Sequence, residues 1–235
     1  MATPQPPVPP YGEGPQVPPP PQPPAASPLP WEQPGYPLLE ALYETAKLIL
    51  LRPSEAFARM STTGDLGRPL VYAVIFGWVG MIAAQLYNLA FRGVMWNLIP
   101  NMPHGGRMMM GPVMNVVLMA VAPVLVLIGV FIWSAIVHLM LLIIGEGKGG
   151  FGGTVRVICY AGTTQVLQVL PICGGLVGFV WGIALEIIGL AKAHRTSQGK
   201  SAIAVLLPIV LCCICVAVSV ALFGAAIMTA IRHSR

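Results

Sequence analysis

The sequence predicts an all-α integral membrane protein: five transmembrane helices, preceded by interfacial amphipathic helices and a disordered proline-rich N-terminal tail. Of its 235 residues, 56% are hydrophobic and only 9% are charged, whereas soluble domains carry about 25% charged residues. Uncharged stretches long enough to cross a bilayer recur along the chain, and the prolines gather at its start. These observations exclude an ordinary soluble enzyme.

The first predicted domain is a disordered tail over residues 1–36. Sixteen of the 24 prolines lie within residues 1–37. Proline lacks a backbone donor and disfavours helix, so we expect a solvated, polyproline-like segment. Its PxxP spacings suit aromatic grooves on protein partners; the alternative is a plain spacer.

The second predicted domain, residues 37–60, consists of two amphipathic helices that lie at the membrane interface. Apolar residues recur at helical spacing, while Glu40, Glu44 and Lys47 occupy the other side. Pro53 disfavours helix at the preceding residue and begins the second piece. The expected apolar face consists of Leu38, Leu39, Leu42, Tyr43, Ala46, Ile49 and Leu50.

The third predicted domain, residues 69–231, holds the spans. The uncharged stretch from Pro112 to Ile144 is too long for one crossing of a hydrocarbon core of about 30 Å, so we expect an extension, a kink at Pro123 and then a span. Residues 92–111 are expected to form a loop. The short third and fourth spans either cross fully or form a re-entrant pair. The five spans are expected at residues 69–90, 123–144, 157–173, 174–190 and 202–231.

Lysines and arginines predict the orientation, because cytoplasmic loops carry an excess of them. With five spans, nine of these residues fall on the side of the N-terminus and four on the other side. This count places the N-terminus in the cytoplasm and the C-terminus outside the cell or in a lumen.

Several stretches carry a family resemblance by their order and spacing. They are residues 51–57 and 67–69, His138 before a Gly/Lys loop, residues 159–161 with Pro171, and residues 181–190 followed by His194 and residues 199–202. Over residues 48–230 the chain resembles the Yip family, the Rab-GTPase-interacting multispanning membrane proteins, and looks most like its prokaryotic relatives.

The resemblance implies a five-span Yip-like domain with a cytoplasmic N-terminus. It also implies a non-enzymatic scaffold or adaptor in membrane organisation or trafficking-like processes. For eukaryotic members it implies binding of prenylated small GTPases, and for prokaryotic ones a place in the plasma (inner) membrane.

Ionisable and amide groups inside the spans are the candidate functional residues, because burying them is costly. Gly174, Gly178 and Gly182 repeat every four residues and Glu186 continues the row. Glu186 is therefore expected inside the bundle, either paired with a glutamine, Arg156 or a hydroxyl, or coupling protons or ions.

Three further polar residues have two interpretations each. His138 is either a hydrogen-bonded core residue or half of a proton-relaying pair with Glu186. Gln165 and Gln168 either make interhelical hydrogen bonds or line a polar path. The functional alternative is a small transporter or channel that uses Glu186, His138 and Gln165.

The remaining expectations concern partners and cofactors. Lys192, Arg195 and Lys200 are placed to contact lipid headgroups. No cofactor or metal is expected: Cys212, Cys213 and Cys215 lack a nearby histidine or carboxylate and suit apolar packing. No catalytic motif is found, and the positive charges flank apolar runs, which argues against nucleic acid. The expected partners are membrane lipids, proteins that bind the tail or the amphipathic helices, and a second copy of the chain.

Overall fold

The computed structural model describes residues 27–98, 112–171 and 173–233, and these are almost entirely helical. Within these ranges there is no strand, so the all-α prediction is confirmed. The elements in chain order are η1 (Pro30–Glu32), α1 (Leu38–Leu51), α2 (Pro53–Arg59), α3 (Gly67–Leu98), α5 (Pro112–Ile143), α6 (Gly150–Ala161), η2 (Gly162–Val169), α7 (Gly174–Ala193) and α8 (Gln198–His233).

In the described part of the chain, four helices are long and apolar enough to cross a membrane, which makes this an integral membrane protein. Their apolar parts are Gly67–Tyr87, Met114–Ile143, Gly174–Ala193 and Gln198–Gly224. The segment expected as the third of five spans is instead a 12-residue α-helix, α6, continued by the eight-residue 3₁₀-helix η2.

Two boundaries differ from the sequence prediction. Helix α3 continues to Leu98, so residues 92–98 are helical and the expected loop does not begin at residue 92. Helix α5 runs unbroken through Pro123 from Pro112 to Ile143. Apolar surroundings offer backbone groups no water as a partner, which favours continued helix even across a proline.

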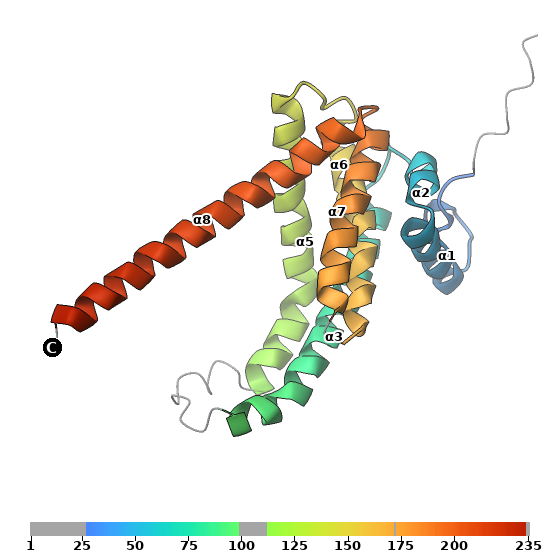
Figure 1. The fold of residues 1–235 in the computed structure, drawn as a ribbon. Helices are drawn as coiled ribbons and strands as arrows, with labels where there is room; N and C mark the ends of the chain where they lie inside the picture. The colour runs from blue at the N-terminus through green and yellow to red at the C-terminus, as the bar shows by residue number, and fades with distance from the viewer. Residues whose placement is uncertain (1–26, 99–111, 172, 234–235) are drawn as a thin grey trace, which may run out of the picture.

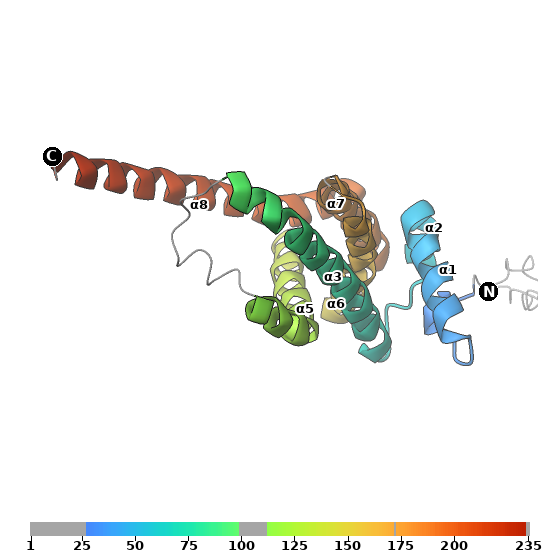
Figure 2. The same ribbon diagram turned by 90° about the horizontal axis from the view of Figure 1, so that it is seen from below.

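The bundle consists of α3, α5, α6 with η2, and α7 (Figure 1). Helices α1 and α2 lie against one side of it, and α8 starts beside the end of α7 and leads away on the opposite side (Figure 2). The ends of α5 and α7 meet the beginnings of α6 and α8 at one end of the bundle, which we call the loop end.

Residues 29–33, which we call the N-terminal latch, pack into the bundle. Leu29 is 1% exposed and Trp31 is 5% exposed, and both belong to the main hydrophobic core. Trp31 donates its indole N–H to the carbonyl of Arg68 at 2.7 Å and its backbone N–H to Thr45 Oγ1 at 2.9 Å. The expectation that everything up to residue 36 is solvated is therefore wrong for the latch. Residues 1–26 of the expected tail lie outside the described residues.

Helix α1 buries one face against the bundle and leaves several large apolar residues exposed. Its buried residues are Ala41, Thr45 and Ile49, spaced four apart. Leu39 is 80% exposed and Tyr43 is 63% exposed, although the sequence placed both on the face with Ile49. Thr45 on the buried face accepts the Trp31 backbone N–H from the latch, and Leu39 and Tyr43 lie on the outward side of the helix.

Helix α7 lies close to η2 along its glycines. A Cβ on Gly178 would stand 3.0 Å from the carbonyl oxygen of Thr164, and one on Gly182 would stand 3.2 Å from Thr164 Oγ1. Close approach through this glycine face is confirmed. It brings the polar side chains of η2 beside the row that ends in Glu186.

Candidate functional site

A half-open cavity of about 780 Å³ lies between α3, α5, η2 and α7, with residues of α6 and α8 also on its wall. Glycine and alanine make up much of its wall, which leaves the space open. Glu186, Gln165 and Gln168 all line it, whereas His138 does not. The structure therefore brings three of the four intramembrane candidates to one site.

Glu186 pairs with an indole. The Trp133 Nε1–H points between the two carboxylate oxygens, at 3.1 Å from Oε1 and 3.0 Å from Oε2. The expected pairings with His138 or Arg156 are not what the structure shows, because those side chains hydrogen-bond elsewhere. Sequence reasoning missed Trp133, although an indole N–H inside an apolar span signals the need for an acceptor.

Gln165 and Gln168 hydrogen-bond to each other within η2. The Gln168 amide donates to Gln165 Oε1. A 3₁₀-helix has three residues per turn, so side chains at i and i+3 lie one above the other. The expected interhelical bond is thus replaced by one inside the element, and both amides keep their place at the cavity.

His138 takes part in a histidine–threonine–histidine chain at the loop end. The backbone N–H of Gly149 donates to His194 Nδ1 at 3.0 Å, so a neutral His194 carries its proton on Nε2. That N–H donates to Thr154 Oγ1 at 2.9 Å, and the Thr154 hydroxyl donates to His138 Nδ1 at 3.0 Å. Every hydrogen bond in this series donates in the same direction, from Gly149 towards His138. The series therefore fixes which nitrogen carries the proton in each neutral histidine ring.

His194 is fully buried and favours the neutral form. The pKa of His194 is lowered to about 4, chiefly by burial and in part by the neighbouring His138, while the carbonyl of Glu146 acts in the opposite direction. Protonation at Nδ1 would also break the bond from Gly149.

We expect the folded protein to lose stability as the pH falls from about 6.5 towards 4. Between these pH values His194 is protonated in the unfolded chain, where its pKa is near 6.5, but stays neutral in the folded protein. Proton binding therefore favours the unfolded state. The thermal midpoint of the protein in neutral detergent should therefore fall between pH 7 and pH 4.5, and His194→Gln should reduce this fall. A flat wild-type profile, or an equal fall in the variant, would contradict the assignment; Lys192→Gln is the control.

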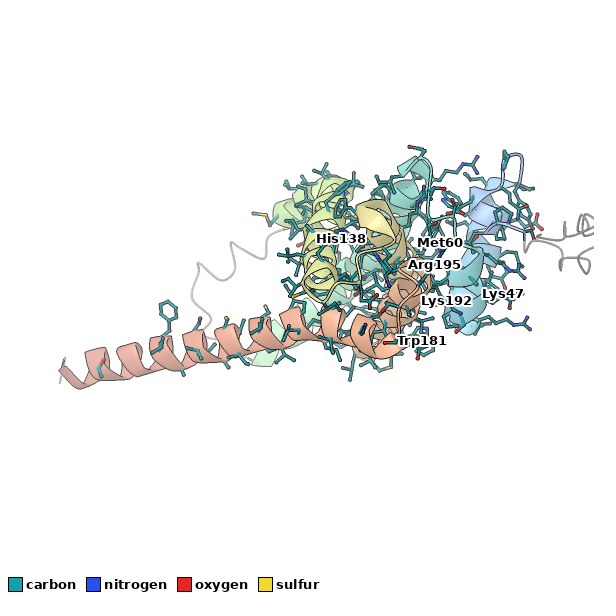
Figure 3. All side chains as sticks on the ribbon, turned by 90° about the horizontal axis from the view of Figure 1, so that it is seen from above. Lys47, Met60, His138, Trp181, Lys192 and Arg195 are labelled. Carbon is teal, nitrogen blue, oxygen red and sulfur yellow. The ribbon has the colours of Figure 1, made fainter. Side chains whose placement is uncertain are left out.

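The basic residues expected at lipid headgroups differ in their surroundings. Lys200 is paired with Glu146, whose other carboxylate oxygen lies 3.2 Å from Lys148 Nζ. Hydrogen bonds from these two lysines lower the pKa of Glu146 to about 2. Lys192 and Arg195 are exposed near the junction of α7 and α8 (Figure 3), and Arg195 has a left-handed φ of 52°.

A second polar cluster, which sequence reasoning did not find, joins the latch to the bundle. Arg156 is 3% exposed and donates to the carbonyls of Thr63 at 2.9 Å and Asp65 at 2.6 Å. Its Nη1 lies 3.4 Å from Glu32 Oε1. The same oxygen accepts the Tyr160 hydroxyl at 2.9 Å. The only indication of this cluster in the sequence was Glu32, an acidic residue inside a proline-rich segment.

The fold and these sites define an all-helical integral membrane protein that collects polar side chains inside a helix bundle. The Yip1 domain matches residues 47–220, more than half of the chain, and the chain therefore belongs to the Yip family. No curated protein and no solved structure matches it. The N-terminal latch lies before the matched region.

Proposed function

We propose that this chain is a non-enzymatic scaffold or adaptor in the membrane, which presents its N-terminal helices and proline-rich tail to partners in the cytoplasm. The observation that carries the proposal is the outward apolar face of α1. Leu38, Leu39, Tyr43 and Leu51 are between 63% and 80% exposed, while the latch and the opposite face fix the helix to the bundle. A firmly held helix with large exposed apolar residues suits contact with lipid or protein.

The proposed topology has five crossings. Segment α6–η2 would serve as the third, because 12 α-helical and eight 3₁₀ residues span about 34 Å. Its irregular backbone is tolerable there because α3 and α7 both pack against η2. Together with the charge count, five crossings support a topology in which the loop end and the N-terminus face the cytoplasm and the C-terminus lies on the other side. In a prokaryotic cell the membrane would be the plasma membrane.

The test is crosslinking in native membranes followed by mass spectrometry. The tail variant deletes residues 2–26 and so leaves the latch intact. The helix variant combines Leu39→Ser with Tyr43→Ser, and its matched control combines Glu40→Ser with Lys47→Ser on the same helix. We expect specific protein partners to be lost with the tail or with the apolar face, and to survive in the control.

Two outcomes separate the possibilities. If all partners survive both the tail deletion and the helix variant, the adaptor proposal is wrong. If protein partners are unaffected but a photoreactive lipid in the same membrane labels α1 less in the helix variant than in its control, the α1 face contacts lipid alone. Crosslinks between two copies of the chain would show the self-association that the sequence left open.

A second candidate function is a small transporter or channel, favoured by the cavity that collects Glu186, Gln165 and Gln168. Its path would use Trp133 in place of His138. Flux into liposomes that Glu186→Gln abolishes would support it, and the absence of flux under proton and cation gradients would remove it.

A further inference from the structure

We propose that the bundle cavity binds a lipophilic amine, an amphiphile whose cationic, hydrogen-bond-donating head pairs with Glu186 and whose apolar tail lies along the cavity wall. This goes beyond the scaffold role, since it gives the bundle a small-molecule site. It requires binding but no transport.

The first argument is charge. Among the described residues, Glu186 is the only ionisable side chain that lines the cavity, and none of the ion pairs includes it. Within the described ranges, the hydrogen-bond donor to Glu186 is the neutral indole of Trp133. A carboxylate in apolar surroundings is costly without a counter-charge. A cationic head satisfies this need, whereas an anionic headgroup or a fatty acid adds repulsion.

The second argument is shape. The volume of about 780 Å³ falls in the range of about 300–1,000 Å³ that is typical of small-molecule sites. Along α7 the wall runs from Gly175 to Glu186, about 16 Å at the helical rise. Apart from a few polar groups the wall is apolar, which suits an alkyl chain extending away from the carboxylate.

The third argument is that no side chain fills the space next to two glycines of the cavity wall. A Cβ on Gly129 or on Gly175 would meet no atom within 4 Å, although both residues line the cavity. Space at these positions is therefore available to a guest. Gly129 also offers a way to fill the cavity without touching Glu186 or Trp133.

The experiment uses the full chain in phosphatidylcholine nanodiscs and three photoreactive probes. The probes are dodecylamine, dodecanol and dodecanoic acid, each with the same diazirine on the alkyl chain, and mass spectrometry maps the labelled peptides. The variants are Glu186→Gln and Gly129→Leu. The matched control is Gly224→Leu, since Gly224 is an exposed α8 glycine with no atom within 4 Å of a Cβ and is not part of the cavity.

We expect the amine to label the cavity peptides of α5 and α7 about tenfold more than the alcohol, the effect of about 1.4 kcal/mol of binding energy. Glu186→Gln should reduce the amine to the level of the alcohol, Gly129→Leu should reduce both, and Gly224→Leu should change neither. Equal labelling by amine and alcohol, stronger labelling by the acid, or amine labelling that survives Gly129→Leu would overturn the proposal. Gly129→Leu decides the matter even if Glu186→Gln fails to fold.

Discussion

Trp31→Ala is expected to destabilise the folded protein by about 3–5 kcal/mol, the usual cost of removing a buried tryptophan. Trp31 is 5% exposed, packs edge-on against Tyr72 at 5.7 Å between ring centres, and donates its indole N–H to the Arg68 carbonyl. The variant leaves a cavity where the latch meets α3, and it removes the hydrogen bond from the indole to the Arg68 carbonyl.

Removing the ion pair that the latch makes through Glu32 should lower the stability of the folded protein by a similar amount. In Glu32→Ala the guanidinium of Arg156 stays buried without its carboxylate, and breaking a buried ion pair from one side costs about 3–5 kcal/mol. Because replacing both partners by apolar residues of similar volume is close to neutral, the double variant Glu32→Leu with Arg156→Met should be more stable than Glu32→Ala alone.

Both effects are measured by denaturant or thermal unfolding of the purified protein in neutral detergent. Trp181→Ala is the matched control, since Trp181 lies on α7 with 36% exposure (Figure 3). Deleting residues 2–26 should leave stability unchanged, whereas deleting residues 2–36 should lower it at least as much as Trp31→Ala. A Trp31→Ala protein as stable as Trp181→Ala would show that the latch does not hold the N-terminal helices to the bundle.

Gly174→Ala is the second substitution from which we expect a large loss of folded-state stability. A Cβ at this position would stand 2.0 Å from the carbonyl oxygen of Leu167, and backbone cannot move aside as a flexible side chain does. Overpacking of this kind costs about 1–3 kcal/mol or more, although alanine is otherwise the better helix former. The variant should separate the start of α7 from the end of η2.

The neighbouring glycine provides the control. A Cβ on Gly175 meets nothing within 4 Å, so Gly175→Ala should be neutral or slightly stabilising in the same unfolding assay. Circular dichroism of both variants shows whether the helices remain. Equal stability of the two variants would mean that α7 and η2 are not in tight contact in the membrane.

The sequence predicted most of the helices because the membrane imposes a simple requirement. An apolar stretch of about 20 residues must form a helix that satisfies its own backbone, so residues 69–90 and 202–231 could be assigned from composition. The break between α1 and α2 followed from Pro53 and the residue before it. The glycine row on α7 likewise predicted close packing, because its spacing depends on helix geometry alone.

The site was predicted only in part. Glu186, Gln165 and Gln168 were predicted as site residues because burying a polar side chain in an apolar span costs free energy. The structure places all three at one cavity. Their partners could not be inferred, since Trp133 lies 53 residues from Glu186 and Thr154 lies 16 residues from His138. Which polar groups meet depends on how each helix is rotated about its axis, and local spacing does not contain that information.

Hydropathy and local motifs were therefore enough to predict a helical membrane protein of the Yip family, because both are properties of single segments. Three features became visible in the folded chain alone: residues 29–33 belong to the bundle, Arg156 is paired with Glu32, and α1 turns Leu39 and Tyr43 outward. A buried ion pair and a buried tryptophan are stable only when distant segments supply their partners, so no local pattern predicts them. The composition of residues 29–33 predicted a solvated tail, whereas their contacts with distant helices bury them in the core.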